Sequence, residues 1–100
     1  MQYILLSAGN NPPSVYIVSD TIAQNLAIHC QNFDHWLHHS PQAAAYRQGN
    51  VVYDTEKDFI TYLNRWVSPS QPVIFLKTLH GISSKEALPE SYQNCPWHHF

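Results

Sequence analysis

Charge is scarce in this chain of 100 residues, where charged side chains make up 12% of the sequence, about half the usual share. The formal net charge is −2, and the five basic residues are scattered rather than gathered into a stripe. Nucleic-acid binding draws most of its affinity from Lys and Arg that neutralise phosphates. The sequence therefore argues against direct binding of DNA or RNA. Neutral polar side chains and His must cover most of the surface, and such surfaces often associate, so we expect a protein partner or a homodimer.

Long apolar runs are also missing. No stretch approaches the roughly 20 apolar residues of a membrane span. The short run 3–6 follows Met1 too closely for a signal peptide, and no basic amphipathic helix is present for membrane attachment. We therefore expect a cytoplasmic protein with no membrane association. In that compartment Cys30 and Cys95 are expected to be free thiols.

Catalytic motifs are absent as well. The chain has three glycines with which to build a phosphate-binding loop, and no Ser lies in a nucleophile elbow. Cys30 falls on the apolar side of a predicted helix, where a thiol behaves as a small hydrophobe. We therefore expect no cofactor and favour a non-catalytic protein. A small homodimeric α+β enzyme with a site at the subunit interface stays open as an alternative.

Apolar residues are plentiful, with 44% hydrophobic residues and thirteen aromatic ones, enough for a core. The first part of the chain predicts a β-hairpin of strands 2–7 and 15–18 around a turn rich in Gly, Asn and Pro. A helix over 20–39 should follow, capped by Ser19 or Asp20. Its apolar residues recur every three or four positions: Ile22, Leu26, Cys30, Phe33 and Leu37.

The second half predicts another helix over 55–67, opened by a Thr-x-x-Asp capping box. The unbroken apolar run in 73–79 is expected to be a central strand covered on both faces, and 51–53 a further short strand. Together these elements predict a single α+β domain over 1–100, with about four mainly antiparallel strands packed with two main helices. The expected core takes residues from both helices and from the apolar strand: Leu26, Phe33, Leu37, Phe59, Leu63, Ile74 and Leu76.

Seven His residues are the most unusual feature of the composition. His35 and His39 are one helical turn apart, the spacing at which two imidazoles can share a metal, and Cys95, His98 and His99 lie close together in the sequence. Zinc sites normally use three or four ligands, and no acidic residue at a suitable spacing completes either group. We predict no tightly bound metal and a tail docked through its aromatic residues. A metal- or redox-responsive protein stays open as an alternative.

Asp54, Glu56 and Asp58 form the one dense acidic cluster, with Tyr53 and Tyr62 nearby. Carboxylates in the first turn of a helix suit the helix dipole, which is one sufficient explanation for them. An acidic edge that also carries tyrosines is what an inhibitor of a cationic enzyme would present to its partner. These five residues are therefore the predicted partner-binding site.

The second half of the chain resembles the small bacterial immunity proteins that neutralise polymorphic or contact-dependent toxins. The resemblance lies in size, layout, an aromatic-rich tail and the lack of a catalytic motif, over four stretches: 55–66, 73–79, 88–92 and 95–100. It implies a non-catalytic immunity or inhibitor protein that occludes a toxin domain, such as a nuclease. It transfers no individual functional residue to this sequence.

Overall fold

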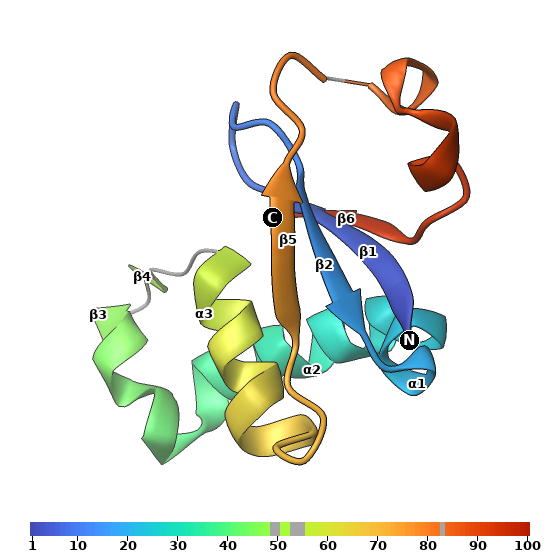
Figure 1. Ribbon diagram of the computed structural model, residues 1–100. Coiled ribbons are helices and arrows are strands. Elements are labelled where there is room, and N and C mark those ends of the chain that lie inside the picture. The colour runs from blue at the N-terminus through green and yellow to red at the C-terminus, as the bar shows by residue number, and fades with distance from the viewer. Residues whose placement is uncertain (49–50, 53–55, 83) are drawn as a thin grey trace.

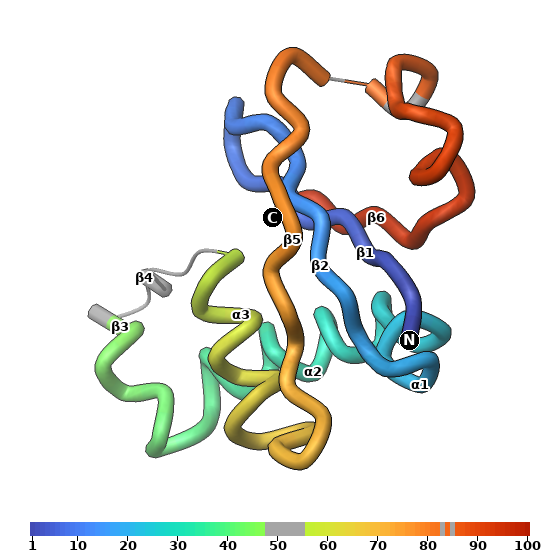
Figure 2. Tube along the Cα trace, in the orientation of Figure 1, coloured from blue at the N-terminus to red at the C-terminus, as the bar shows by residue number. Residues whose placement is uncertain are grey.

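The computed structural model describes residues 1–48, 51–52, 56–82 and 84–100 (Figures 1 and 2). They form a small α+β domain around a four-stranded mixed sheet, which confirms the predicted fold class. The strand order is β5-β2-β1-β6, and the strands are β1 (Gln2–Ser7), β2 (Ser14–Val18), β5 (Ile74–Thr78) and β6 (Trp97–His99). Within the described residues, no helix is long and apolar enough to cross a membrane.

The predicted hairpin is confirmed. β1 and β2 pair antiparallel from Gln2 opposite Val18 to Leu6 opposite Ser14. The turn between them contains Gly9 at φ +56°, a left-handed conformation that glycine adopts without the steric cost of a Cβ atom. This hairpin forms the centre of the sheet, since β5 pairs with its one side and β6 with the other.

The helical segment 20–39 is two helices rather than one: α1 (Asp20–Gln24) and α2 (Leu26–His39). The break is at Asn25, which lies outside the helical region at φ −119° and ψ 27°. Its side-chain amide donates to the carbonyl of Thr21 (3.0 Å), a local bond of the kind with which Asn competes against helical structure. Ser19, one of the two residues predicted to cap this segment, caps α1. The predicted apolar stripe of the segment is buried throughout.

After α2 comes a short 3₁₀ helix, η1 (Pro41–Tyr46), with Ser40 as its N-terminal cap. A second helical unit follows. The helix α3 (Glu56–Tyr62) runs directly into one π-helical turn, η2 (Leu63–Val67). Between η1 and α3 the chain forms a separate two-stranded ribbon of β3 (Arg47–Gln48) and β4 (Val51–Val52). The predicted short strand at 51–53 is therefore present at 51–52, although it pairs with β3 and not with the main sheet, and Tyr53 is outside the described residues.

The last segment of the chain supplies the fourth strand. After β5 come two 3₁₀ turns, η3 (Lys85–Ala87) and η4 (Glu90–Tyr92), and then β6, which pairs parallel to β1. The sequence predicts this tail as irregular but docked. It does dock, and the backbone N–H of Leu5 donates to the Pro96 carbonyl (2.9 Å) while that of Phe100 donates to the Ser7 carbonyl (2.7 Å).

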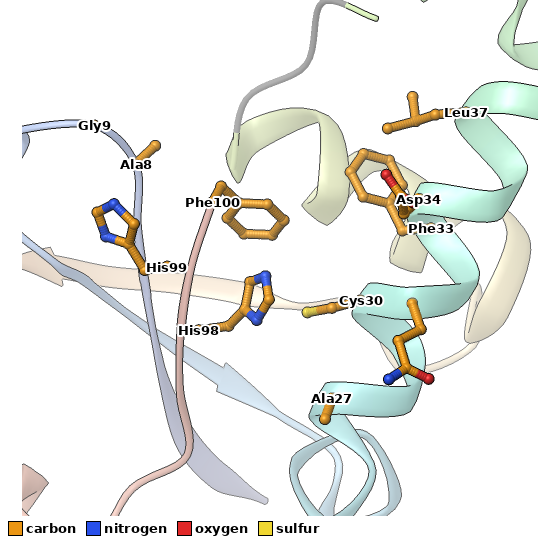
Figure 3. A pocket seen from close by; sticks show the side chains of 11 residues that line it. Ala8, Gly9, Ala27, Cys30, Phe33, Asp34, Leu37, His98, His99 and Phe100 are labelled. Atoms are coloured by element: carbon orange, nitrogen blue, oxygen red, sulfur yellow. The ribbon is translucent and has the colours of Figure 1, made fainter.

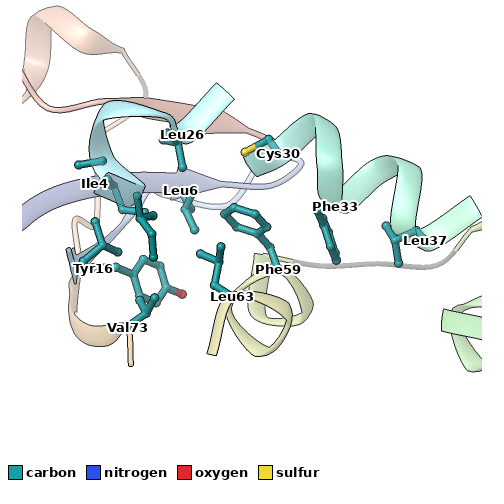
Figure 4. Packing of buried hydrophobic residues seen from close by; sticks show 13 residues of the cluster. Ile4, Leu6, Tyr16, Leu26, Cys30, Phe33, Leu37, Phe59, Leu63 and Val73 are labelled. Atoms are coloured by element: carbon teal, nitrogen blue, oxygen red, sulfur yellow. The ribbon is translucent and has the colours of Figure 1, made fainter. Parts of the chain in front are cut away.

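Each face of the sheet carries its own core. On one face, strand residues such as Ile4 and Leu6 pack with the helices, and all five predicted helical core residues are buried there (Figure 4): Leu26, Phe33, Leu37, Phe59 and Leu63. On the other face, Leu5 and Val15 pack under the segment that follows β5. The sheet is thus covered by helices on one side and by 3₁₀ turns on the other.

The prediction for the apolar strand is wrong in one respect. β5 is an edge strand that pairs with β2 alone, and the side chains of Ile74 and Leu76 are 51% and 41% exposed. Only the ends of the predicted stretch, Val73 and Leu79, are buried. The hydrophobic pattern could not predict the exposure of Ile74 and Leu76, because the sequence of an apolar run is the same whether or not other segments cover it.

Candidate functional site

A pocket of about 730 Å³ separates α2 from the end of the chain (Figure 3). In it the imidazole of His98 faces the thiol of Cys30, with Asp34 and Phe100 also on its wall. Burial raises the pKa of the Cys30 thiol to about 12, so the thiol is protonated at neutral pH. Burial and the neighbouring His99 lower the pKa of His98, which favours its neutral form. The Cys30 thiol of the pocket is therefore not a thiolate nucleophile at neutral pH.

Trp97 and His99 of the tail contact Ser7 of β1, and His99 also lines the pocket of His98. The hydroxyl oxygen of Ser7 lies 2.8 Å from Nδ1 of His99 and accepts a hydrogen bond from Nε1 of Trp97 (3.0 Å). Ser7 is only 2% exposed, and its two bonds hold β6 against β1, while His99 itself is exposed. Cys95 packs with Trp97 in the second core and away from the pocket of His98.

The two His groups of the sequence are consequently not brought together. His35 and His39 lie on the exposed side of α2, with ring centroids 4.3 Å apart and planes tilted by 36°, and line a different pocket from His98. Over the described residues, no three or more His, Cys, Asp or Glu side chains are arranged to hold a metal ion. The structure thus offers neither group the three or four ligands of a zinc site.

The predicted acidic edge is divided between two sides of α3, and Tyr53 and Asp54 lie outside the described residues. Glu56 turns toward the sheet and accepts a hydrogen bond from the phenol of Tyr16 (3.2 Å). Tyr62 turns toward α2, where its ring lies 5.3 Å from that of Phe33. Asp58 is half-buried on the same helix. The structure therefore does not bring Glu56 and Tyr62 onto one surface.

Glu56 lines a pocket of about 410 Å³ between the start of α3 and the open edge of the sheet. Burial raises the pKa of its carboxyl group, although the bond from Tyr16 and the charge of Lys57 act in the opposite direction. The pKa of Tyr16 rises to about 12, because of burial first and the carboxylate second. The pocket thus combines a half-buried carboxylate with the apolar wall formed by Ile60 and Phe75.

The edge strand next to this pocket carries three consecutive large apolar side chains that are exposed. Ile74 is 51%, Phe75 56% and Leu76 41% exposed. Phe75 packs edge-on against Tyr16, with centroids 5.6 Å apart, and so borders the pocket of Glu56. Sequence reasoning found this strand but missed its exposure, and the one available signal was its position just after a Pro-rich turn, where an edge strand is tolerated.

A second exposed apolar surface surrounds Trp36 and is called here the Trp36 surface. Its members come from α2, η1, α3 and η2: Trp36, Tyr46, Tyr62, Arg65 and Trp66. The ring of Trp36 lies 5.2 Å from Tyr62 and 6.3 Å from Trp66, and the Arg65 guanidinium lies 5.3 Å from the Trp66 ring. Trp66 follows the fully buried Leu63 by three residues, yet its own side chain is 46% exposed.

In the Ser7–His99 contact Ser7 is buried and His99 is exposed, and the Cys30 thiol is protonated at neutral pH. The pocket of Glu56 and the Trp36 surface are lined largely by apolar and aromatic side chains. Comparison with protein-family models, with curated protein sequences and with solved structures found no significant match.

Proposed function

We propose that this chain is a non-catalytic protein-binding domain that presents the open edge of β5 to a partner protein. The observation that carries the proposal is the exposure of Ile74, Phe75 and Leu76, three neighbouring large apolar residues on a strand paired on one side alone. Proteins usually protect such an edge with charges, Pro or a covering segment, because it is a ready template for pairing. β5 has one such charge, Lys77, but its three large apolar side chains remain exposed, and a partner that covers them would explain this exposure.

The partner is expected to add an extended segment to β5. Backbone groups on the outer side of an edge strand give such a complex its affinity, and pockets for alternate side chains give its specificity. The pocket between Phe75 and Glu56 is placed to receive one such side chain. A residue that combines an apolar stem with a positive charge fits it best, because it would contact Ile60 and also pair with the half-buried carboxylate.

The resemblance to small immunity proteins suggests the biological role. We propose that the partner is a toxin domain and that the chain inhibits it by occluding its active site. A cationic enzyme such as a nuclease would be drawn to the acidic residues at the start of α3, Glu56 and Asp58 among them. The β5 edge would then supply most of the buried contact, and the acidic residues would mainly speed the encounter.

The experiment compares two substitutions of equally exposed residues. Phe75→Lys places a charge on the β5 edge, and Ile28→Lys does the same on α2, where Ile28 is 54% exposed. A partner captured from the source cells by the native chain should be retained by the Ile28 variant and lost by the Phe75 variant. The captured partner is then purified, and its dissociation constant and its own activity are measured with each chain. Thermal unfolding checks that both variants fold.

Two results would overturn the proposal. One is a partner that binds the Phe75 variant as tightly as the native chain. The other is a stable homodimer that Phe75→Lys dissociates into monomers, because the open edge would then be occupied by a second copy. Analytical ultracentrifugation of the native chain separates the second result from the expected monomer.

A charge reversal tests the acidic residues separately. Changing Glu56 and Asp58 to Lys should slow association strongly at low salt and less at high salt, because charges at the rim act through long-range attraction. The matched control reverses Glu86 and Glu90, which are exposed acidic residues of the segment after β5. If both pairs of reversals leave the association rate unchanged, the carboxylates of α3 have no part in attracting the partner.

A further inference from the structure

We propose that His35 and His39 form an exchangeable surface site for a divalent transition-metal ion of the kind that imidazole ligands prefer: Ni²⁺, Cu²⁺ or Zn²⁺. The two residues are one helical turn apart near the end of α2, and both are exposed. With two protein ligands, such a site holds the metal reversibly and leaves coordination positions open. It shares no residue with the pocket of Glu56 and does not depend on the partner proposed for β5.

The two imidazole rings lie close enough to share one ion. Their centroids are 4.3 Å apart and their planes are tilted by 36°. Imidazole nitrogens bind zinc at about 2.0–2.1 Å, so the centroids of two rings bound to one ion lie roughly 5 Å apart. The observed separation differs from this value by about 1 Å or less. A small rotation of two exposed side chains is therefore enough to bring both rings onto one metal.

The core holds the backbone under this pair in place. Phe33 and Leu37, on the opposite side of α2, are each 1% exposed. Residues three or four apart on a helix lie on the same face, one above the other. The packing of α2 thus fixes the spacing of His35 and His39, and places Asn32, three residues before His35, on the same stripe. A metal ion would meet two ligands whose backbone positions are set before it binds.

Both rings keep their nitrogens available to a metal. Among the described residues, neither His35 nor His39 has a side-chain hydrogen bond to another protein group. The neighbouring His38 differs, because its Nδ1 donates to the carbonyl of Asp34 (2.8 Å) and lies 3.6 Å from the carboxylate of the same residue. The ring centroids of His38 and His39 are 6.4 Å apart. His38 is therefore a matched control for the pair.

A pocket of about 450 Å³ beside the pair has room for the ion and its remaining ligands. Besides the two His residues it is lined by Asn32, Trp36, Ser40 and Tyr62. The side-chain amide of Asn32 can hydrogen-bond to a water molecule on the metal, as groups around a metal site commonly do. Among the described residues that line this pocket, none is a Lys or Arg that would repel a cation.

The end of α2 also favours positive charge. His39 is the last residue of this 14-residue helix, and the carbonyl groups of a last helical turn carry a partial negative charge. The fold already uses this charge, because the guanidinium of Arg47 donates to the carbonyl of Leu37 (2.8 Å). A metal ion held by His35 and His39 would lie at the same end of the helix.

The number of ligands sets the strength of the site. Structural zinc sites use three or four protein ligands, and the described residues offer no third His, Cys, Asp or Glu to this pair. We expect affinity in the micromolar range, with Cu²⁺ bound more tightly than Ni²⁺ or Zn²⁺. Water, or a donor group of another molecule, would fill the positions that the chain leaves open.

The test titrates the native chain, without an affinity tag, with Ni²⁺ and follows the heat of binding and the amide NMR spectrum. We expect one ion per chain at micromolar concentration. Because Ni²⁺ is paramagnetic, the resonances around His35 and His39 should broaden first. His35→Gln and His39→Gln should each weaken binding about tenfold or more, at least the loss seen when a group that supports a ligand is removed. His38→Gln should bind Ni²⁺ with native affinity.

Three results would overturn the inference. The first is a native chain that millimolar Ni²⁺ does not saturate. The second is native affinity in both His35→Gln and His39→Gln, with circular dichroism confirming that each variant is folded. The third is broadening centred on His98 and Cys95, which would assign the metal to the end of the chain instead. Phe75→Lys should leave the affinity for Ni²⁺ unchanged, so this test and that of the proposed function fail independently.

Discussion

The replacement Phe33→Ala should remove the aromatic centre of the larger core. Phe33 is 1% exposed, and its ring lies 5.3 Å from those of Phe59 and Tyr62 and 6.3 Å from that of Phe100. Truncation of a buried Phe costs about 3 to 5 kcal/mol, partly lost transfer energy and partly the cavity that remains. We expect the upper part of this range, because the neighbours belong to α2, α3 and the segment after β6 and cannot all move inward together.

Urea unfolding followed by circular dichroism measures this loss as a lower midpoint at an unchanged slope. The control is Ile28→Ala on the same helix, whose side chain is 54% exposed and whose removal should change stability by about 0.5 kcal/mol or less. A loss below about 1 kcal/mol for Phe33→Ala would refute the reasoning, since no fully buried aromatic residue with these neighbours can be removed so cheaply. In a double-mutant cycle, Phe33 and Phe59 should show a coupling of about 0.5 to 1.5 kcal/mol.

Three smaller perturbations have signs that follow from the structure. Ser19→Ala should lower the free energy of unfolding by about 1 kcal/mol in urea titrations, because the first turn of α1 loses its side-chain cap. Because the pKa of Glu56 is raised, the folded state holds the carboxyl proton more tightly than the unfolded state does. The free energy of unfolding should therefore fall as the pH rises from 4.5 through the folded pKa, and Glu56→Gln should remove that fall. The lowered pKa of His98 has the opposite effect: stability should be lost as the pH falls from 6.5 through the folded pKa, and thermal unfolding of His98→Gln should show less of that loss.

Local patterns predicted the elements of this fold well where one face of a segment is buried. The hairpin followed from two apolar runs around a turn, and the stripe that ends at Leu37 is buried as expected. The pattern could not show the break at Asn25, because the apolar spacing continues across it. The parallel pairing of β6 with β1 joins residues at opposite ends of the chain, and no local pattern encodes such a contact.

The candidate sites were harder to predict than the fold. The acidic residues were identified from their density in the sequence, but the partners of their side chains depend on packing: Glu56 faces Tyr16 in the sheet, while Tyr62 faces α2. The open β5 edge includes Ile74 and Leu76, which the sequence assigns to the core, although both side chains are exposed. An apolar residue left open by the fold cannot be distinguished in sequence from one that is buried.

The sequence by itself determined that this is an α+β protein with a large core, few charges and no catalytic motif. It did so because composition, turn residues and hydrophobic periodicity act over short stretches of chain. Only the tertiary structure decided that β5 lies at an edge, that Trp66 lies at the surface, and that His98 and Cys95 occupy opposite faces of the sheet. Those properties depend on which distant segments pack together, and in this chain they define the surfaces that are open to a partner.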